Sequence, residues 1–93
     1  MNIYPEVGET IGKYTIKSIL GKGATATVYK AVHKYLNIEV ALKILSPELI
    51  EQDQTIQERF LEEAMNHARL QHANLVRITD VEKDEQFLWE ARQ

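Results

Sequence analysis

The sequence predicts an α+β fold in which a twisted antiparallel sheet of five strands packs against one major helix. Two observations predict this class. Three runs of alternating apolar and polar residues lie between residues 13 and 45, and a longer segment near residues 54–71 repeats apolar residues at helical spacing. Two more alternating runs follow the helical segment. The expected order of elements is therefore β-β-β-α-β-β.

Length and composition indicate one small globular domain and exclude several classes of function. The chain has 93 residues, of which 44% are hydrophobic and 27% charged. A net charge of −3 and scattered basic residues argue against nucleic-acid binding. The chain has no cysteine, and His33, His67 and His72 lack zinc-site spacing, so we expect no metal site. No signal peptide or membrane-spanning run is visible in the sequence, so we expect no membrane contact and a cytoplasmic protein.

The first half of the chain predicts a leader followed by a three-stranded meander. Pro5, Gly8 and Gly12 interrupt residues 1–12, which we expect to be an irregular leader. Strands are expected near 13–21 and 26–34, joined by a turn that contains Gly21 and Gly23, and a third near 38–45. Glycines at the turn leave backbone N–H groups accessible to a ligand such as phosphate.

The third predicted strand carries a lysine among apolar residues. Because side chains alternate across a strand, Ala41 and Lys43 share one face, and Val40, Leu42 and Ile44 share the other. One face of this strand therefore suits a hydrophobic core, and the other presents a cation.

The second half of the chain predicts the helix and the last two strands. Ser46 and Pro47 form a helix-start signal, and a second start at Asp53 opens the main helix. Its apolar stripe is expected to contain Ile56, Phe60, Ala64 and Ala68, widened by Leu61, Met65 and Leu70. Glu63 lies at the edge of this stripe and is expected to point towards the sheet. A fourth strand is expected at 75–81, and a fifth begins at 86.

Four segments resemble, in order, motifs of the amino-terminal lobe of protein kinases, most closely the bacterial Ser/Thr kinases. The segment from Leu20 to Tyr29 resembles the glycine-rich loop, and Val40-Ala41-Leu42-Lys43 resembles the lysine strand. Residues 59–64 resemble the helix that carries the conserved glutamate, and residues 72–76 resemble the turn after it. The resemblance implies a leader at 1–12 and a partial kinase domain at 13–93 that ends near the hinge.

The resemblance also implies an ATP site. The backbone of residues 21–26 would cover the phosphates, while Lys43 would bridge the α- and β-phosphates and pair with Glu63. An apolar roof over adenine would be formed by Leu20, Val28 and Ala41. The implied ATP-binding residues are Leu20, Gly21, Lys22, Gly23, Ala24, Thr25, Ala26, Val28, Ala41 and Lys43. The third glycine of the family loop is replaced by Ala26.

The family reaction is transfer of the ATP γ-phosphoryl group to a Ser or Thr hydroxyl of a protein. The 93 residues contain none of the family's HRD, DFG or APE segments, which carry the catalytic base and the magnesium ligands. Binding of Mg²⁺ would require the second lobe. We therefore expect the isolated chain to be catalytically inactive, with Lys43 and Glu63 as an orienting pair.

Other interpretations of these residues stay open. Gly21 and Gly23 are also typical of an ordinary hairpin, Lys43 of a strand lysine that reaches water, and Glu63 of a surface helical pair with Arg59. At the level of function, the alternatives are a gene fragment and a non-catalytic, pseudokinase-like interaction module. Such a module would bind another kinase, a kinase second lobe or a regulatory protein through the main helix or the underside of the sheet.

Overall fold

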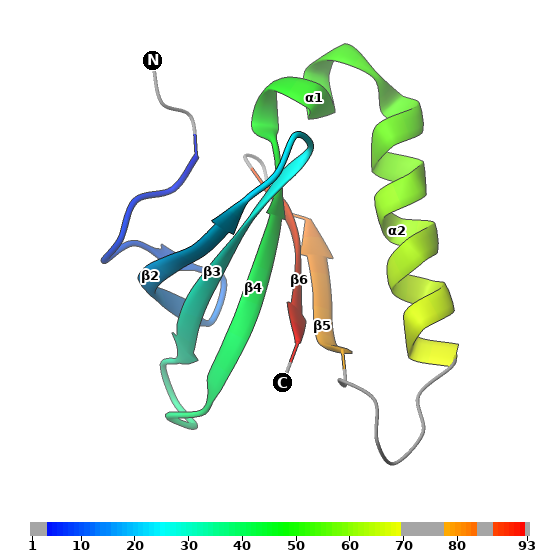
Figure 1. Cartoon of the computed structure of the whole chain (residues 1–93). Coiled ribbons are helices and arrows are strands. Elements are labelled where there is room, and N and C mark those ends of the chain that lie inside the picture. Colours follow the sequence, from blue (N-terminus) through cyan, green and yellow to red (C-terminus); the bar gives the residue numbers. More distant parts are fainter. Residues whose placement is uncertain (1–3, 70–77, 84–86, 93) are drawn as a thin grey trace.

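The chain folds around one curled antiparallel sheet with a long helix on one side (Figure 1). The computed structural model describes residues 4–69, 78–83 and 87–92. The strands are β1 (Thr10–Ile11), β2 (Tyr14–Lys22), β3 (Ala26–His33), β4 (Glu39–Leu45), β5 (Ile78–Lys83) and β6 (Leu88–Arg92), in the spatial order β1-β2-β3-β4-β6-β5. This arrangement confirms the predicted α+β class.

The sheet has six strands where five were predicted, because β1 forms within the segment expected to be an irregular leader. Ile11 pairs with Tyr14 across a tight turn in which Gly12 adopts φ +58°, and Ile11 is buried. The glycines at 8 and 12 therefore mark turns around a short strand, rather than the absence of regular structure.

Strands β2, β3 and β4 form the predicted meander. The β3–β4 turn contains Asn37 at φ 56°, a left-handed conformation that asparagine tolerates. The pairing of β2 with β3 shifts register twice, between Ile16 and Ser18 and between Ile19 and Gly21. Such bulges increase the local twist, and here they curl the sheet where the glycine turn begins.

Two helices connect β4 to β5. Helix α1 spans Pro47–Gln52 with Pro47 in its first turn, and Ser46 occupies the cap position without a side-chain capping bond. Helix α2 spans Gln54–Arg69, close to the predicted 54–71, and the Asp53 carboxylate accepts a hydrogen bond of 2.9 Å from the Thr55 N–H at its start. Asp53 therefore caps α2, whereas α1 has no side-chain cap at its start.

The two faces of the sheet differ in composition. The face turned away from α2, here called the outer face, carries the larger core. Val40, Leu42 and Ile44 are buried there, as the alternation in this strand predicted. The face turned towards α2, here called the inner face, carries Ala41 and Lys43, which are half-buried. Helix α2 lies against this inner face, where Phe60 packs with Leu45 and Leu88.

The amino-terminal segment covers the outer face, on the opposite side of the sheet from α2 (Figure 1). The Tyr29 hydroxyl donates a hydrogen bond of 3.1 Å to the Pro5 carbonyl. A Cβ at Gly12 would lie 2.7 Å from the Trp89 ring, closer than van der Waals contact allows, so this turn requires glycine. The segment from Tyr4 to Ile11 is therefore part of the domain's packing.

Some predicted segments lie outside the described residues. These are residues 1–3, the kinase-like turn at 72–76 and most of the polar turn expected at 83–85. The expected fourth strand at 75–81 corresponds to β5, and the fifth corresponds to β6. Neither described helix is long and apolar enough to cross a membrane.

Candidate functional site

Strand register brings three of the candidate residues together on the inner face. Val28 on β3 lies directly opposite Lys43 on β4, and Ala41 precedes Lys43 by two residues on the same face. All three are half-buried. The result is a shallow apolar surface with one ammonium group beside it, which suits a ligand with a flat apolar part and an anionic part.

The glycine turn between β2 and β3 is short, exposed and anchored at its tip. The Gly23 N–H donates to the Ala26 carbonyl at 2.8 Å, and the Thr25 carbonyl accepts a bond of 2.8 Å from the Ser46 N–H at the end of β4. A Cβ at Gly21 would meet no atom within 4 Å, so this position is open to a ligand. In this conformation the Gly23 N–H already has a partner within the hairpin, while the turn as a whole, including Ala24, stays exposed.

Two candidate residues of the loop are placed away from Lys43. Lys22 lies opposite Thr27 in the β2–β3 register, and both line a pocket on the outer face together with Tyr29. Leu20 lies within a register shift of β2 and is 59% exposed. Lys22 can therefore contribute to an inner-face ligand through its backbone, but its side chain lies on the other side of the sheet.

Lys43 and Glu63 do not form an ion pair in this structure. The Lys43 ammonium lies 5.8 Å from the centroid of the Phe60 ring, within the range of a cation–π contact, and Glu63, one turn further along α2, is exposed. The ion pairs among the described residues are Lys30–Glu39 and Arg92–Glu90. The side chain of Glu63 thus faces water, although the sequence predicted that it points towards the sheet.

A second carboxylate lies beside Lys43, and sequence reasoning did not give it this role. Glu90 on β6 pairs directly with Lys43 in the sheet register, and Arg92 pairs with Ala41, so all of these side chains share the inner face. Glu90 is 2% exposed and accepts a hydrogen bond of 2.8 Å from the Arg92 Nε, in addition to their ion pair. The sequence did contain a signal for this pair: Glu90 and Arg92 carry opposite charges two residues apart, and residues at this spacing in a strand lie on one face.

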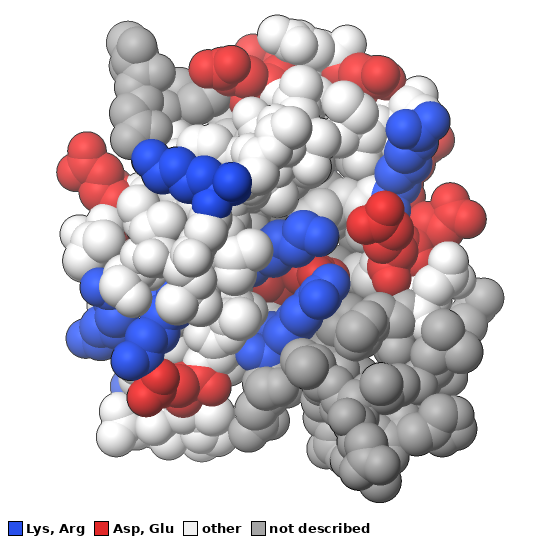
Figure 2. Space-filling model, in the orientation of Figure 1, with Lys and Arg blue, Asp and Glu red and all other residues white. Residues whose placement is uncertain are grey.

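The inner face is therefore a charged site bounded by apolar groups. At the centre of the face seen in Figure 2, basic and acidic atoms lie together in a recess. The inner-face positions of β4 and β6 supply two cations, Lys43 and Arg92, and one carboxylate, Glu90. The excess of positive charge favours an anionic ligand. Within the part of the chain that is described, no group of three or more potential metal ligands occurs.

Comparison with known families and proteins identifies relatives of this arrangement. The protein kinase domain model matches residues 14–90. The serine/threonine-protein kinase PksC of Streptomyces coelicolor is 38% identical over 74 residues, which are 80% of this chain and 13% of that protein. A probable serine/threonine-protein kinase of Clostridium acetobutylicum is 42% identical over 72 residues, which are 77% of this chain and 11% of that protein.

Solved structures show the same fold. The kinase domain of PknI from Mycobacterium tuberculosis is 31% identical with a TM-score of 0.73, and the match covers 97% of this chain and 36% of that one. The apo form of PpkA-294 gives a TM-score of 0.84 at 18% identity and supports the fold alone; that match covers 99% of this chain and 39% of the other. The chain thus spans between a third and two fifths of the solved kinase chains that it matches, and about an eighth of the curated relatives.

Proposed function

The chain belongs to the protein kinase family, and from this premise we propose that its inner face binds ATP as the amino-terminal lobe of a Ser/Thr protein kinase. The observation that carries the proposal is the register that places Lys43 beside Val28 and Ala41. The lysine supplies positive charge for the phosphates, and the two small apolar side chains supply a surface for the purine.

The glycine turn forms the cover over the phosphates in this proposal. Gly21 is exposed, and no atom lies within 4 Å of the place where a side chain would begin, so the backbone can approach a phosphate closely there. The pairing of Lys43 with Glu63 requires α2 to rotate or shift, because Glu63 is exposed and Phe60 occupies the position beside the ammonium. ATP and a second lobe are the partners expected to favour that movement.

We also propose that the isolated 93-residue chain does not transfer phosphate. Phosphoryl transfer depends on metal ions and on a residue that positions the attacking hydroxyl, and the HRD and DFG segments that carry these groups in the family are not among these 93 residues. Incubation with ATP, Mg²⁺ and Ser- or Thr-containing peptides should give no turnover. Robust phosphorylation by the pure chain would contradict this proposal.

Titration with a fluorescent ATP analogue tests the binding site. The wild-type chain should bind saturably, and Lys43→Met should weaken binding by about tenfold or more, because a charge-assisted contact to phosphate is lost. Lys17→Met is the matched control, since Lys17 is an exposed lysine on β2. Equal affinities of all three chains would show that the nucleotide binds elsewhere.

A second candidate function is a non-catalytic interaction module that binds through α2. Leu61 and Met65 were predicted to widen the buried stripe of this helix, but they are 38% and 55% exposed. Exposed apolar side chains one turn apart on a helix are typical of a surface that meets another protein. If this is the function, Leu61→Ser/Met65→Ser should abolish partner binding and leave ATP affinity unchanged.

A further inference from the structure

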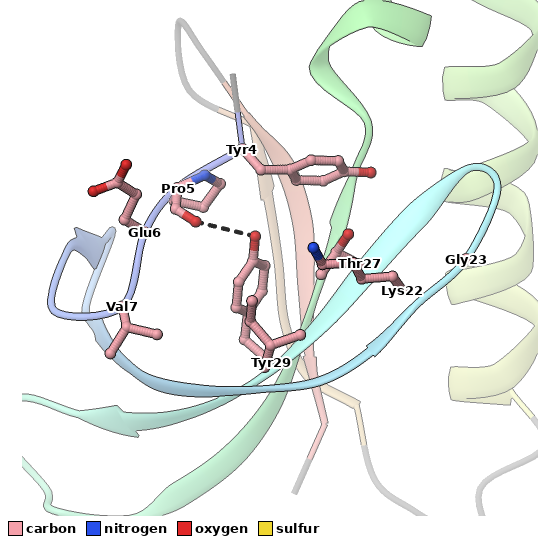
Figure 3. A pocket seen from close by; sticks show the side chains of 9 residues that line it. Tyr4, Pro5, Glu6, Val7, Lys22, Gly23, Thr27 and Tyr29 are labelled. Atoms are coloured by element: carbon pink, nitrogen blue, oxygen red, sulfur yellow. Dashed lines mark hydrogen bonds between the residues drawn. The ribbon is translucent and has the colours of Figure 1, made fainter. Parts of the chain in front are cut away.

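The outer face contains a pocket on the opposite side of the sheet from Lys43 of the proposed ATP site. It has a volume of about 340 Å³ and lies between the amino-terminal segment and the β2–β3 hairpin (Figure 3). Its walls include Pro5, Val7, Ile19 and Tyr29, and Lys22 and Thr27 line it from the hairpin. A volume of this size admits a small organic molecule, since ligand pockets begin at about 300 Å³.

The polar groups of the pocket gather at one end. Lys22 and Thr27 are directly opposite each other on neighbouring strands, and Figure 3 shows both side chains on the hairpin side of the pocket. Among the described residues, neither the Lys22 ammonium nor the Thr27 hydroxyl has a hydrogen-bond or ion-pair partner. An ammonium and a hydroxyl donor side by side are suited to a carboxylate.

Tyr4 also lines the pocket, and neither of the other two polar side chains, those of Glu6 and Tyr29, competes for this cation. Glu6 lines the opposite side, and its carboxylate points away from Lys22 in Figure 3. The Tyr29 hydroxyl is committed to the Pro5 carbonyl, and burial, followed by the nearby Tyr4 and Glu9, raises the pKa of this phenol to about 12, so Tyr29 stays neutral. The Tyr29 wall therefore stays uncharged beside a single cationic end.

We propose that this pocket binds a small aromatic carboxylate, with the carboxylate held by Lys22 and Thr27 and the ring against Tyr29, Ile19 and Pro5. The ring faces an aromatic and aliphatic surface, and the anion faces two unpartnered donors. The ligand binds on the opposite face of the sheet from Lys43, so it does not occupy the proposed ATP site.

The test uses 2-naphthoate as the probe, with its neutral analogue 2-naphthalenemethanol as the matched ligand. Two-dimensional ¹H–¹⁵N spectra of the 93-residue chain should show saturable shifts at the amides of Lys22, Gly23 and Thr27. Lys22→Met should weaken the binding of naphthoate by about tenfold, and Thr27→Val by about threefold, because each removes a donor to the carboxylate. Lys17→Met, an exposed lysine on the same strand, should bind as the wild type does.

Four results would overturn the proposal, three of them measured without ATP. The first is that the amide shifts do not saturate by about 10 mM naphthoate, a concentration higher than the dissociation constant of a specific site. The second is that the chain binds the acid and the alcohol with equal affinity. The third is that Lys22→Met, with a spectrum that shows a folded chain, binds naphthoate as tightly as the wild type does. A saturating ATP analogue should leave naphthoate affinity unchanged, and competition between the two would place the carboxylate on the inner face instead.

Discussion

On the outer face of the sheet, Leu42, Ile44 and Trp89 are almost fully buried beneath the amino-terminal segment, whereas the inner face of the same strands carries Lys43 and Glu90. Neighbouring residues of one strand thus contribute alternately to a hydrophobic core and to a charged site. The buried outer face supplies most of the hydrophobic stabilisation, and this leaves the inner face able to carry charges that suit a ligand better than a core.

Removing a large side chain from the outer face should have the largest effect on stability. Trp89 is 1% exposed, contacts Tyr14 edge to face with ring centroids 5.5 Å apart, and lies against Gly12. We expect Trp89→Ala to lower the free energy of unfolding by about 3–5 kcal/mol, through lost burial and the cavity left behind. Urea denaturation followed by circular dichroism measures this.

Lys43→Met is the control on the inner face for this comparison. It keeps the length of the side chain and removes only the charge, so the free energy of unfolding should change by less than about 0.5 kcal/mol. A loss for Lys43→Met as large as that for Trp89→Ala would mean that the inner face, too, is essential for folding.

The two carboxylates considered as partners of Lys43, Glu90 and Glu63, provide the next comparison. We expect Glu90→Gln to lower the free energy of unfolding by about 1–3 kcal/mol, because a buried acceptor of the Arg92 guanidinium is weakened. Glu63→Gln should change it by less than about 0.5 kcal/mol, since Glu63 is exposed and has no ion pair here. Thermal denaturation of both variants measures the difference, and a larger loss for Glu63→Gln would show that the helix carboxylate is the one held in the folded chain.

Apart from the control variants, the smallest expected loss of stability concerns Tyr29 on the outer face. Tyr29→Phe removes the hydrogen bond to the Pro5 carbonyl and should cost about 1 kcal/mol at neutral pH. The pKa of Tyr29 is raised from 10.0 to about 12, chiefly by burial. Between these values the unfolded phenol ionises while the folded phenol keeps its proton, so the stability that the phenol contributes is complete below pH 10 and is lost as pH rises towards 12.

Urea denaturation of both chains at several pH values from neutral to alkaline isolates this group from the other tyrosines and the lysines. The wild-type chain should lose stability more steeply above pH 10 than Tyr29→Phe does. Parallel curves for the two chains would show that the phenol titrates alike in the folded and unfolded states.

Local patterns predicted the elements and the faces of single strands. The alternation from Val40 to Ile44 gave the correct division between core and inner face, and the spacing of Ile56, Phe60 and Ala64 gave the main helix. Both depend on neighbouring residues alone, so one sequence suffices to detect them.

Features that depend on distant pairing could not be predicted in the same way. The proximity of Glu90 to Lys43 follows from the placement of β6 beside β4, a contact between strands more than forty residues apart. The exposure of Glu63 depends on the rotation of α2, in which Phe60 lies beside Lys43 instead. The outer-face position of Lys22 depends on the register shift in β2, and a one-residue change of register reverses the face of a side chain.

An acyl phosphate derivative of ATP tests most directly whether the inner face is the nucleotide site. The lysine amine next to the phosphates attacks the acyl carbonyl, forms an amide and releases ATP, so peptide mass spectrometry identifies that lysine. We expect the label on Lys43, and we expect excess ATP to prevent labelling. Labelling of Lys22 or Lys17 to the same extent as Lys43, unaffected by ATP, would contradict the assignment of the inner face as the ATP site.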